Sequence, residues 1–137
     1  MRQYENCIVY LLAKAYQRAH GNFKRRLQPF GLTPVQHLIM EVLWDEEGLS
    51  AGDIGKRVLL DNATLSGVLD RMAEARWIRK EPDPGDKRIM RVYGAKRAMA
   101  LKTSLQAERE AVNDELLQPL RVEERILLKR LLRDLQD

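Results

Sequence analysis

The chain has 137 residues, 45% of them hydrophobic and 32% charged, which is the balance of a single small globular domain. Its net charge of +4 is too small to identify a partner by itself. No run approaches the roughly 18 apolar residues of a membrane span, the single Cys7 excludes an internal disulfide, and the two histidines lie too far apart for a metal site. The first six residues lack the profile of a signal peptide, so we expect a cytoplasmic protein. We also expect no cofactor.

Two helices are predicted at the start of the chain. Residues 4–27 contain no proline and carry an apolar stripe at helical spacing, formed by Ile8, Leu11, Leu12, Ala15 and Ala19. Pro29 and Gly31 favour a turn after this helix. Thr33 is suited to cap a second helix that begins at Pro34 and is apolar on most of its circumference up to Trp44. A helix of this kind is expected to be buried on two sides.

Two further helices follow a short acidic connection. Ser50, with Asp53 three residues later, resembles a capping box and predicts a short helix over 51–58. Asp61 is the expected N-cap of the next helix, whose apolar stripe consists of Leu65, Val68, Leu69 and Met72. The exposed first turns of this helix carry small hydrogen-bonding side chains, which suit close approach to another surface.

The periodicity changes to that of strands at Trp77. Residues 77–81 and 90–93 predict two short strands joined by a charged, turn-rich tip over 82–88. Pro82 confines the first of these strands to an edge. A long helix is predicted over 95–118 and a final helix over 122–135, with Pro119 between them.

This order of elements is that of a winged helix-turn-helix, so the predicted fold class is mainly α with a small β-wing. In such a fold the second helix of the pair enters the major groove of DNA, and the hairpin reaches the minor groove. The charge agrees with this prediction, because residues 51–100 hold 11 basic and 7 acidic side chains. Eight of the basic ones lie between Arg76 and Arg97. On charge alone, a solvated surface explains the cluster equally well.

Several side chains suit contact with DNA. Asn62, Thr64 and Ser66 are small and polar at the start of the predicted recognition helix, while Lys56 and Arg57 are placed to contact the phosphate backbone. Arginine favours a narrow minor groove, so the basic residues at the wing tip, Lys87 and Arg88, are expected there. Asp86 is positioned to orient the Arg88 guanidinium through a bidentate pair.

Four stretches in register, residues 31–36, 49–55, 60–72 and 83–88, resemble the MarR family of bacterial transcription regulators. The resemblance implies a homodimer that binds a palindromic operator in double-stranded DNA, with residues 31–95 as the DNA-binding lobe and residues 1–30 and 96–137 as the dimerisation region. It further implies a repressor released by a small aromatic effector. The residues assigned to DNA binding are Ser50, Lys56, Arg57, Asn62, Ala63, Thr64, Ser66, Gly67, Arg71, Asp86, Lys87 and Arg88.

The chain departs from the family pattern at two places. Arg76 stands where the family usually has a glycine that closes the recognition helix, so Arg76 must adopt a left-handed conformation or end the helix differently, at about 1 kcal/mol. After the second wing strand the family often has Leu-Thr-(Glu/Asp)-Lys-Gly, whereas this chain has residues 93–97 with the sequence Tyr-Gly-Ala-Lys-Arg. The join to the long helix is therefore expected to differ.

Other functions stay open at this point. A second stripe on the second helix, formed by His37, Met40 and Trp44, lines either an effector pocket or, as we favour, the core. Cys7 raises the alternative of a redox-sensing regulator, although no basic residue within one helical turn would lower the pKa of its thiol. Winged helices also serve as protein-interaction modules without DNA. No nucleophile–base pair, metal cluster or phosphate loop is recognisable, so we expect no enzyme.

Overall fold

The computed structural model describes residues 1–136, and it confirms the mainly helical fold class with a small sheet. The helices are α1 (Ile8–Leu27), α2 (Pro34–Asp45), α3 (Ala51–Val58), α4 (Asn62–Glu74), α5 (Lys96–Ala100), α6 (Lys102–Leu117) and α7 (Val122–Asp134). The strands are β1 (Leu49–Ser50), β2 (Ile78–Pro82) and β3 (Met90–Gly94). None of the described helices is long and apolar enough to cross a membrane.

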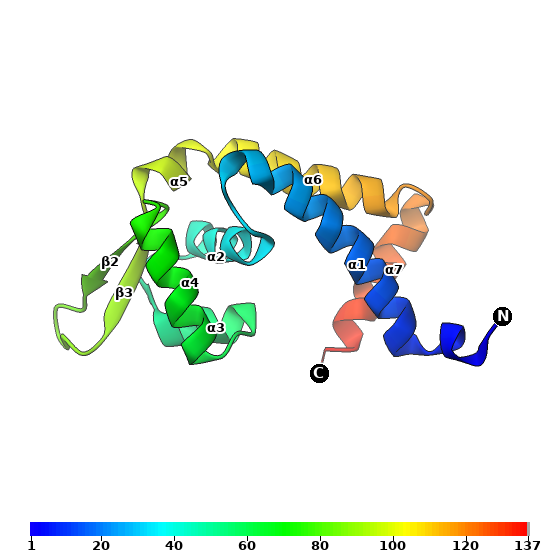
Figure 1. The fold of residues 1–137 in the computed structure, drawn as a ribbon, viewed down its shortest axis with the longest axis horizontal. Coiled ribbons are helices and arrows are strands. Elements are labelled where there is room, and N and C mark those ends of the chain that lie inside the picture. Colours follow the sequence, from blue (N-terminus) through cyan, green and yellow to red (C-terminus); the bar gives the residue numbers. More distant parts are fainter. Residues whose placement is uncertain (137) are drawn as a thin grey trace.

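The elements form a lobe at one end of the molecule and a helical arm at the other (Figure 1). The lobe contains α2, α3, α4 and the hairpin of β2 and β3, whereas the arm contains α1, α6 and α7, with the N-terminus at its far end. Helices α1 and α6 lie side by side along this arm. The wing hairpin projects from the lobe at the end of the molecule opposite the N-terminus.

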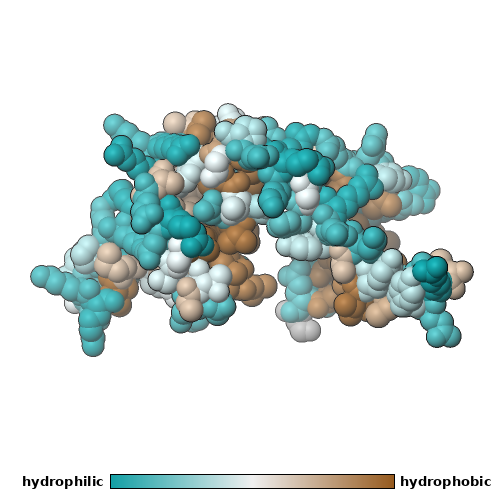
Figure 2. Space-filling view, viewed as in Figure 1, coloured by the Kyte–Doolittle hydropathy of each residue, from teal (hydrophilic) through white to brown (hydrophobic). Residues whose placement is uncertain are grey.

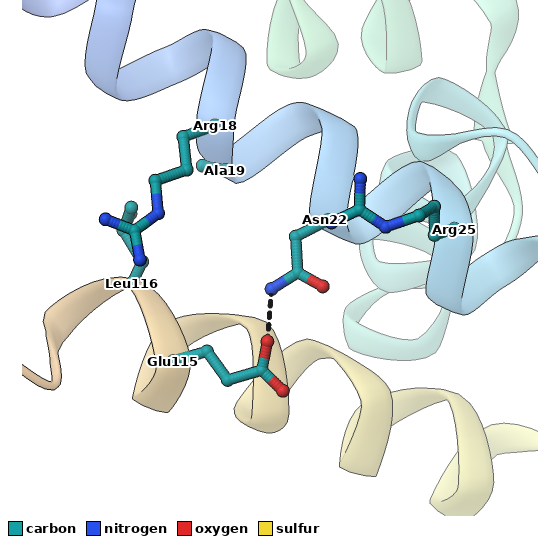
Figure 3. A pocket seen from close by; sticks show the side chains of 6 residues that line it. All are labelled: Arg18, Ala19, Asn22, Arg25, Glu115 and Leu116. Carbon is teal, nitrogen blue, oxygen red and sulfur yellow. Dashed lines mark hydrogen bonds between the residues drawn. The ribbon is translucent and has the colours of Figure 1, made fainter.

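Polar contacts join α6 to α1 in addition to their apolar packing. The Asn22 amide donates to Glu115 at 2.6 Å, as Figure 3 shows. Arg26 forms ion pairs with both Glu115 and Glu108, the latter at 3.0 Å. These contacts hold the two helices in one register, so α1 and α6 form a single arm.

The core of the lobe is apolar and comes from every element around it. The predicted stripe of α4 is confirmed, because its four members are all buried. Leu27 of α1 and Leu105 of α6 reach the same core, which joins the arm to the lobe. The largest side chains that are almost completely buried are Trp77, Leu27, Ile39, Met40, Leu43, Ile54, Leu65, Leu69, Met72 and Leu105.

The sheet is antiparallel, with strand order β1-β3-β2. β2 is therefore an edge strand, as Pro82 at its end predicts. The sequence pattern did not predict β1, because two residues are too few to show a period of two. β1 pairs Leu49 with Val92, which attaches the base of the wing to the start of α3.

The predicted helix starts are confirmed by their caps. The Thr33 hydroxyl accepts the Gln36 amide at 3.2 Å, and the Gln36 side chain accepts the Thr33 amide in return. Ser50 caps α3 by accepting the Asp53 amide at 3.2 Å. In the turn between α3 and α4 the chain passes very close to itself, since a Cβ at Gly55 would lie 3.3 Å from the Leu60 carbonyl oxygen. Glycine thus fits the tight helix-turn-helix corner without a shift of its neighbours.

Three predicted helices have different bounds in the structure. The first begins at Ile8 rather than Tyr4, because Cys7 is extended with ψ 130° and separates α1 from a short 3-10 turn over Gln3–Asn6. The long helix predicted over 95–118 is wrong as a single element, since it breaks at Leu101 (φ −99°, ψ 3°) into α5 and α6. Neither break contains a proline or glycine, so the sequence offered no signal for it. The final helix ends at Asp134, one residue earlier than predicted.

Arg76 closes α4 in a left-handed conformation, with φ 63°. Its amide donates to the Ala73 carbonyl at 3.1 Å, and the Trp77 amide donates to the Met72 carbonyl at 2.9 Å. This pair of bonds is the Schellman pattern of a helix C-terminus, in which the left-handed position is normally a glycine. The departure at Arg76 therefore leaves the helix end unchanged and places a bulky side chain in a conformation that glycine adopts without strain.

Arg76→Gly is expected to stabilise the fold by about 1 kcal/mol, because glycine removes the steric cost of the left-handed backbone. Urea unfolding followed by circular dichroism measures the change. Arg79→Gly is a suitable contrast, since it introduces glycine in a strand and is expected to destabilise. An unchanged or lower unfolding free energy for Arg76→Gly would contradict the prediction.

Candidate nucleic-acid interface

The tip of the wing presents one oriented arginine. Arg88 donates from Nε to Asp86 Oδ1 at 3.0 Å and from Nη2 to Asp86 Oδ2 at 2.9 Å. The predicted bidentate pair is therefore present, and the Arg88 side chain nevertheless stays 90% exposed. The hydrogen bonds from Arg88 hold the pKa of the Asp86 carboxyl below its ordinary value. The pair fixes the guanidinium plane while leaving its outer edge free for a ligand.

The base of the wing depends on two residues that were not predicted as part of the site. Asp83 accepts the amides of Gly85 and Asp86 at 2.9 and 3.0 Å, and it accepts Arg91 Nε at 2.6 Å. The bond from Arg91 is the main reason that the pKa of Asp83 lies below its ordinary value. Arg91 also donates to the Gly48 carbonyl at 2.9 Å, which ties the wing to the segment before α3. An Asp before Pro-Gly is a sequence signal for such a turn, whereas nothing in the sequence indicated Arg91.

The start of α4 and the tip of the wing lie on the same side of the lobe (Figure 1). The residues predicted at the start of α4 are exposed, and so are Arg71 and both basic residues of the wing tip. The carboxylate of Asp61 caps the helix by accepting the Thr64 amide at 2.8 Å. The predicted DNA-binding residues that are exposed on α4 and at the wing tip are Asn62, Ala63, Thr64, Ser66, Arg71, Lys87 and Arg88.

Several predicted DNA-binding residues already have partners within the chain. Thr64 Oγ1 donates to Asp61 at 3.0 Å, and Arg57 forms an ion pair with Glu46 at 2.6 Å. Ser50 is half-buried and serves as the cap of α3, and Gly67 is half-buried beneath the Arg71 guanidinium. Lys56 is exposed on α3. To contact DNA, Thr64 and Arg57 would therefore have to give up these partners within the chain.

The eight basic residues between Arg76 and Arg97 do not form one surface. Lys87 and Arg88 lie at the wing tip, whereas four other cations line a separate groove at the opposite end of α4, namely Arg76, Arg79, Lys96 and Arg97. The reason is geometric, because β2 begins at the end of α4 and runs away from it toward the tip. Sequence proximity therefore merged two surfaces that the fold separates.

A cavity of about 320 Å³ lies between α1, α2 and α6. Its lining includes Tyr16, His20, Phe23, Leu38 and Arg109. The three residues predicted for an effector pocket do not line it, since His37 and Met40 are almost completely buried and Trp44 packs against the core. They belong to the stripe of α2 that faces inward, and helical spacing alone does not indicate which stripe borders a cavity.

A buried polar network stands beside this cavity. His37 packs edge-to-face against Phe23, with ring centroids 4.9 Å apart, and its Nε2 lies 3.3 Å from the Glu41 carboxylate without a hydrogen bond. Glu41 also forms an ion pair with Arg109 at 2.7 Å. Burial lowers the pKa of His37 to about 4, with a smaller contribution from the positive charge of Arg109. His37 is therefore neutral at pH 7, and Arg109 is held at the wall of the cavity.

Comparison with known proteins agrees with this geometry. Residues 32–90, which span the lobe from the start of α2 to the wing, match the model of the MarR family. The chain belongs to the MarR family. Its curated relatives in that family include regulators of transcription rather than enzymes. The TtmR regulator of Methylorubrum extorquens is 36% identical over 94 residues, which cover 69% of this chain but only 47% of TtmR.

Three other comparisons cover nearly the whole chain. The repressor NicR of Pseudomonas putida is 28% identical over 130 residues, covering 95% of this chain and 82% of NicR. The structure of Bordetella bronchiseptica BpsR, which concerns regulation of its DNA binding by 6-hydroxynicotinic acid, is 26% identical with a TM-score of 0.92 and covers 100% and 98% of the two chains. A mutant Escherichia coli MarR complexed with operator DNA has the same fold, with a TM-score of 0.90 at 20% identity over both full chains.

Proposed function

We propose that the chain is a homodimeric, sequence-specific DNA-binding regulator, a repressor that a small aromatic acid releases from its operator. The observation that carries the proposal is the shared face of the recognition helix and the wing, with Arg88 oriented by Asp86. In a winged helix-turn-helix this face places α4 in the major groove and Arg88 in the minor groove. The similarity to NicR and BpsR supports the same role.

The start of α4 supplies the contacts that would read sequence. An Asn side chain such as Asn62 can bind adenine through two hydrogen bonds, while Ser66 and Thr64 are less selective. The amides of the first turn of α4 favour a phosphate group, and Lys56 adds a cation nearby on α3. We assign residues 31–95 to this DNA-binding lobe.

The arm supplies a surface for dimerisation. No side chain of α7 is buried in the described chain. Apolar residues of α1 and α7 are exposed instead, and Figure 2 shows the hydrophobic surface at this end of the molecule. The exposed residues of these two helices include Ile8, Val9, Leu11, Leu12, Tyr16, Val122, Ile126, Leu127 and Leu131. A second copy of the chain would cover them and would place two recognition helices about 34 Å apart, one turn of DNA.

The cavity between α1, α2 and α6 fits the effector. Its volume of about 320 Å³ is that of a small-molecule site, and its wall combines aromatic rings with the cation of Arg109. A carboxylate can pair with Arg109 while an aromatic ring packs against Phe23 and Tyr16. Because the cavity joins arm helices to α2 of the lobe, binding there can change the spacing of the two recognition helices.

Arg88→Ala is expected to weaken operator binding about 10- to 100-fold, since each of the two wings loses a contact of about 1 kcal/mol or more. It should also relax the preference for A·T-rich flanks. Fluorescence anisotropy on the DNA upstream of the protein's own gene measures both effects, with scrambled DNA as the reference and Arg133→Ala as a control on α7. Equal affinity for the operator and the scrambled DNA would reject the proposal. A salt dependence without a steep log–log slope would instead indicate a protein-interaction module.

Arg109→Gln is expected to raise the concentration of aromatic acid needed for release at least about tenfold, because it removes the charge that pairs with the carboxylate. Titration of the protein–operator complex with 6-hydroxynicotinic acid and benzoic acid measures this. Arg133→Gln makes the same charge change away from the cavity and should respond like the wild type. If Arg109→Gln leaves the operator at the same concentration of aromatic acid as the wild type, the effector binds elsewhere.

A further inference from the structure

A basic groove lies at the C-terminal end of α4, which is the end farther from the wing tip. Its volume is about 460 Å³, and its floor consists of small or aliphatic side chains. It lies between the end of α4, the start of β2 and the start of α5. The residues that line it are Ala73, Ala75, Arg76, Ile78, Arg79, Ala95, Lys96 and Arg97. None of these residues carries a carboxylate.

Two of the four cations are held in place by aromatic rings. The Arg97 guanidinium stacks 4.1 Å from the centroid of the Trp77 ring and donates to the Ala75 carbonyl at 3.1 Å. The Arg79 guanidinium lies 4.6 Å from the centroid of Tyr93 and forms an ion pair with Glu81. Stacking orients a guanidinium without neutralising it, so Arg97 keeps its full charge at the groove.

The other two cations have no ion-pair partner among residues 1–136. Arg76 and Lys96 are both exposed and enter the groove from opposite sides, one from the end of α4 and one from the start of α5. A groove lined by charges of one sign concentrates counter-ions. Its formal charge attracts an anion with more than one charged group.

Both departures from the family pattern meet at this groove. Arg76 stands where the family usually has a glycine and Arg97 where it often has one, and 20 residues separate the two positions. The backbone of Arg76 is left-handed, a conformation that is unfavourable for arginine. Strained backbone conformations cluster at functional sites, so a strained residue in a charged groove points to a ligand there.

We propose that this groove binds a small organic polyanion that carries two or more carboxylate or phosphate groups. A volume of about 460 Å³ matches a small-molecule site, and the floor formed by Ile78 and alanine methyl groups accommodates the carbon skeleton. Operator DNA is not the occupant, because α4 has 13 residues and so separates this groove from the start of the recognition helix by about 20 Å.

The position of the groove gives the ligand a regulatory role. An anion between Arg76 and Lys96 joins the end of the recognition helix to the first helix after the wing. It therefore restricts movement between the lobe and the arm. Binding of the anion is then coupled to any process that changes the angle between the lobe and the arm. The binding itself does not depend on the DNA-binding function proposed above, so the two can fail separately.

Isothermal titration calorimetry of the full chain tests the proposal, with citrate and inorganic pyrophosphate as probes and sodium chloride matched for ionic strength. We expect saturable binding of one anion per chain for at least one probe. Citrate alone would indicate a carboxylate ligand and pyrophosphate alone a phosphate ligand. Arg76→Gly and Lys96→Gln should each weaken binding about fivefold. Arg133→Gln, which removes a cation on α7, should leave it unchanged.

These variants separate binding from folding, because Arg76→Gly is expected to stabilise the chain while it weakens the binding of the anion. Equal affinity of wild type and Arg76→Gly, or no saturable binding of either probe, would overturn the proposal. Loss of binding in Arg88→Ala but not in Arg76→Gly would place the anion on the DNA-facing side and would overturn it too. Binding of a polyglutamate peptide without either small anion would assign the groove to a protein partner instead.

Discussion

A glutamate in place of Leu131 will leave the chain monomeric and will lower its affinity for the operator at least about 100-fold, because both half-sites must then be bound independently. Leu131 is 44% exposed on α7, in a chain where no side chain of that helix is buried. Burial of a leucine of this kind against a second copy stabilises by about 1.5–3 kcal/mol, and a glutamate there would bring a charge into an apolar interface. Sedimentation velocity measures the oligomeric state, and anisotropy measures operator binding.

Lys129→Gln is the matched control for this substitution. Position 129 points to the opposite side of α7, since two residues correspond to about 200° of helix, and the change in charge is the same. This variant should remain dimeric and bind DNA like the wild type. A dimeric Leu131→Glu would show that α7 lies outside the interface, and a monomer that binds the operator at full affinity would remove dimerisation from the mechanism.

The sequence predicted those parts of the molecule that depend on neighbouring residues. Helix starts at Thr33, Ser50 and Asp61 follow from side chains that cap amides three positions ahead. The pair of Asp86 and Arg88 is equally local, because two positions separate its members. Local chemistry of this kind is visible in a single sequence, and so is the periodicity of α4.

Contacts between distant segments could not be predicted in the same way. Arg91 reaches the Gly48 carbonyl across 43 positions, and no pattern in the sequence connects them. The division of the basic cluster into two surfaces depends on the direction in which β2 leaves α4, and the breaks at Cys7 and Leu101 contain no helix breaker. The inward position of His37 likewise depends on how α1 and α6 pack around α2.

The stability of the chain is expected to fall by about 3 kcal/mol between pH 6.5 and pH 4 because of His37 alone. In the folded chain burial lowers the pKa of His37 to about 4, whereas in the unfolded chain it has its ordinary value of 6.5. As the pH falls through this interval the unfolded chain takes up a proton that the folded chain does not, so the free energy of unfolding decreases. Above about pH 7.5 the histidine is neutral in both states and contributes no pH dependence.

Urea unfolding of the wild type and of His37→Met at intervals from pH 7.5 to pH 4.5 isolates this contribution. Carboxylates titrate in both proteins, so the difference between their unfolding free energies reports the histidine. We expect His37→Met to lose less stability than the wild type below pH 6.5, and we expect His20→Gln, which removes the other histidine, to keep the steeper dependence. If the wild type and His37→Met lose stability in parallel, then the histidine accepts its proton in the folded chain. In that case the Glu41 carboxylate, 3.3 Å from Nε2, outweighs both burial and the nearby charge of Arg109.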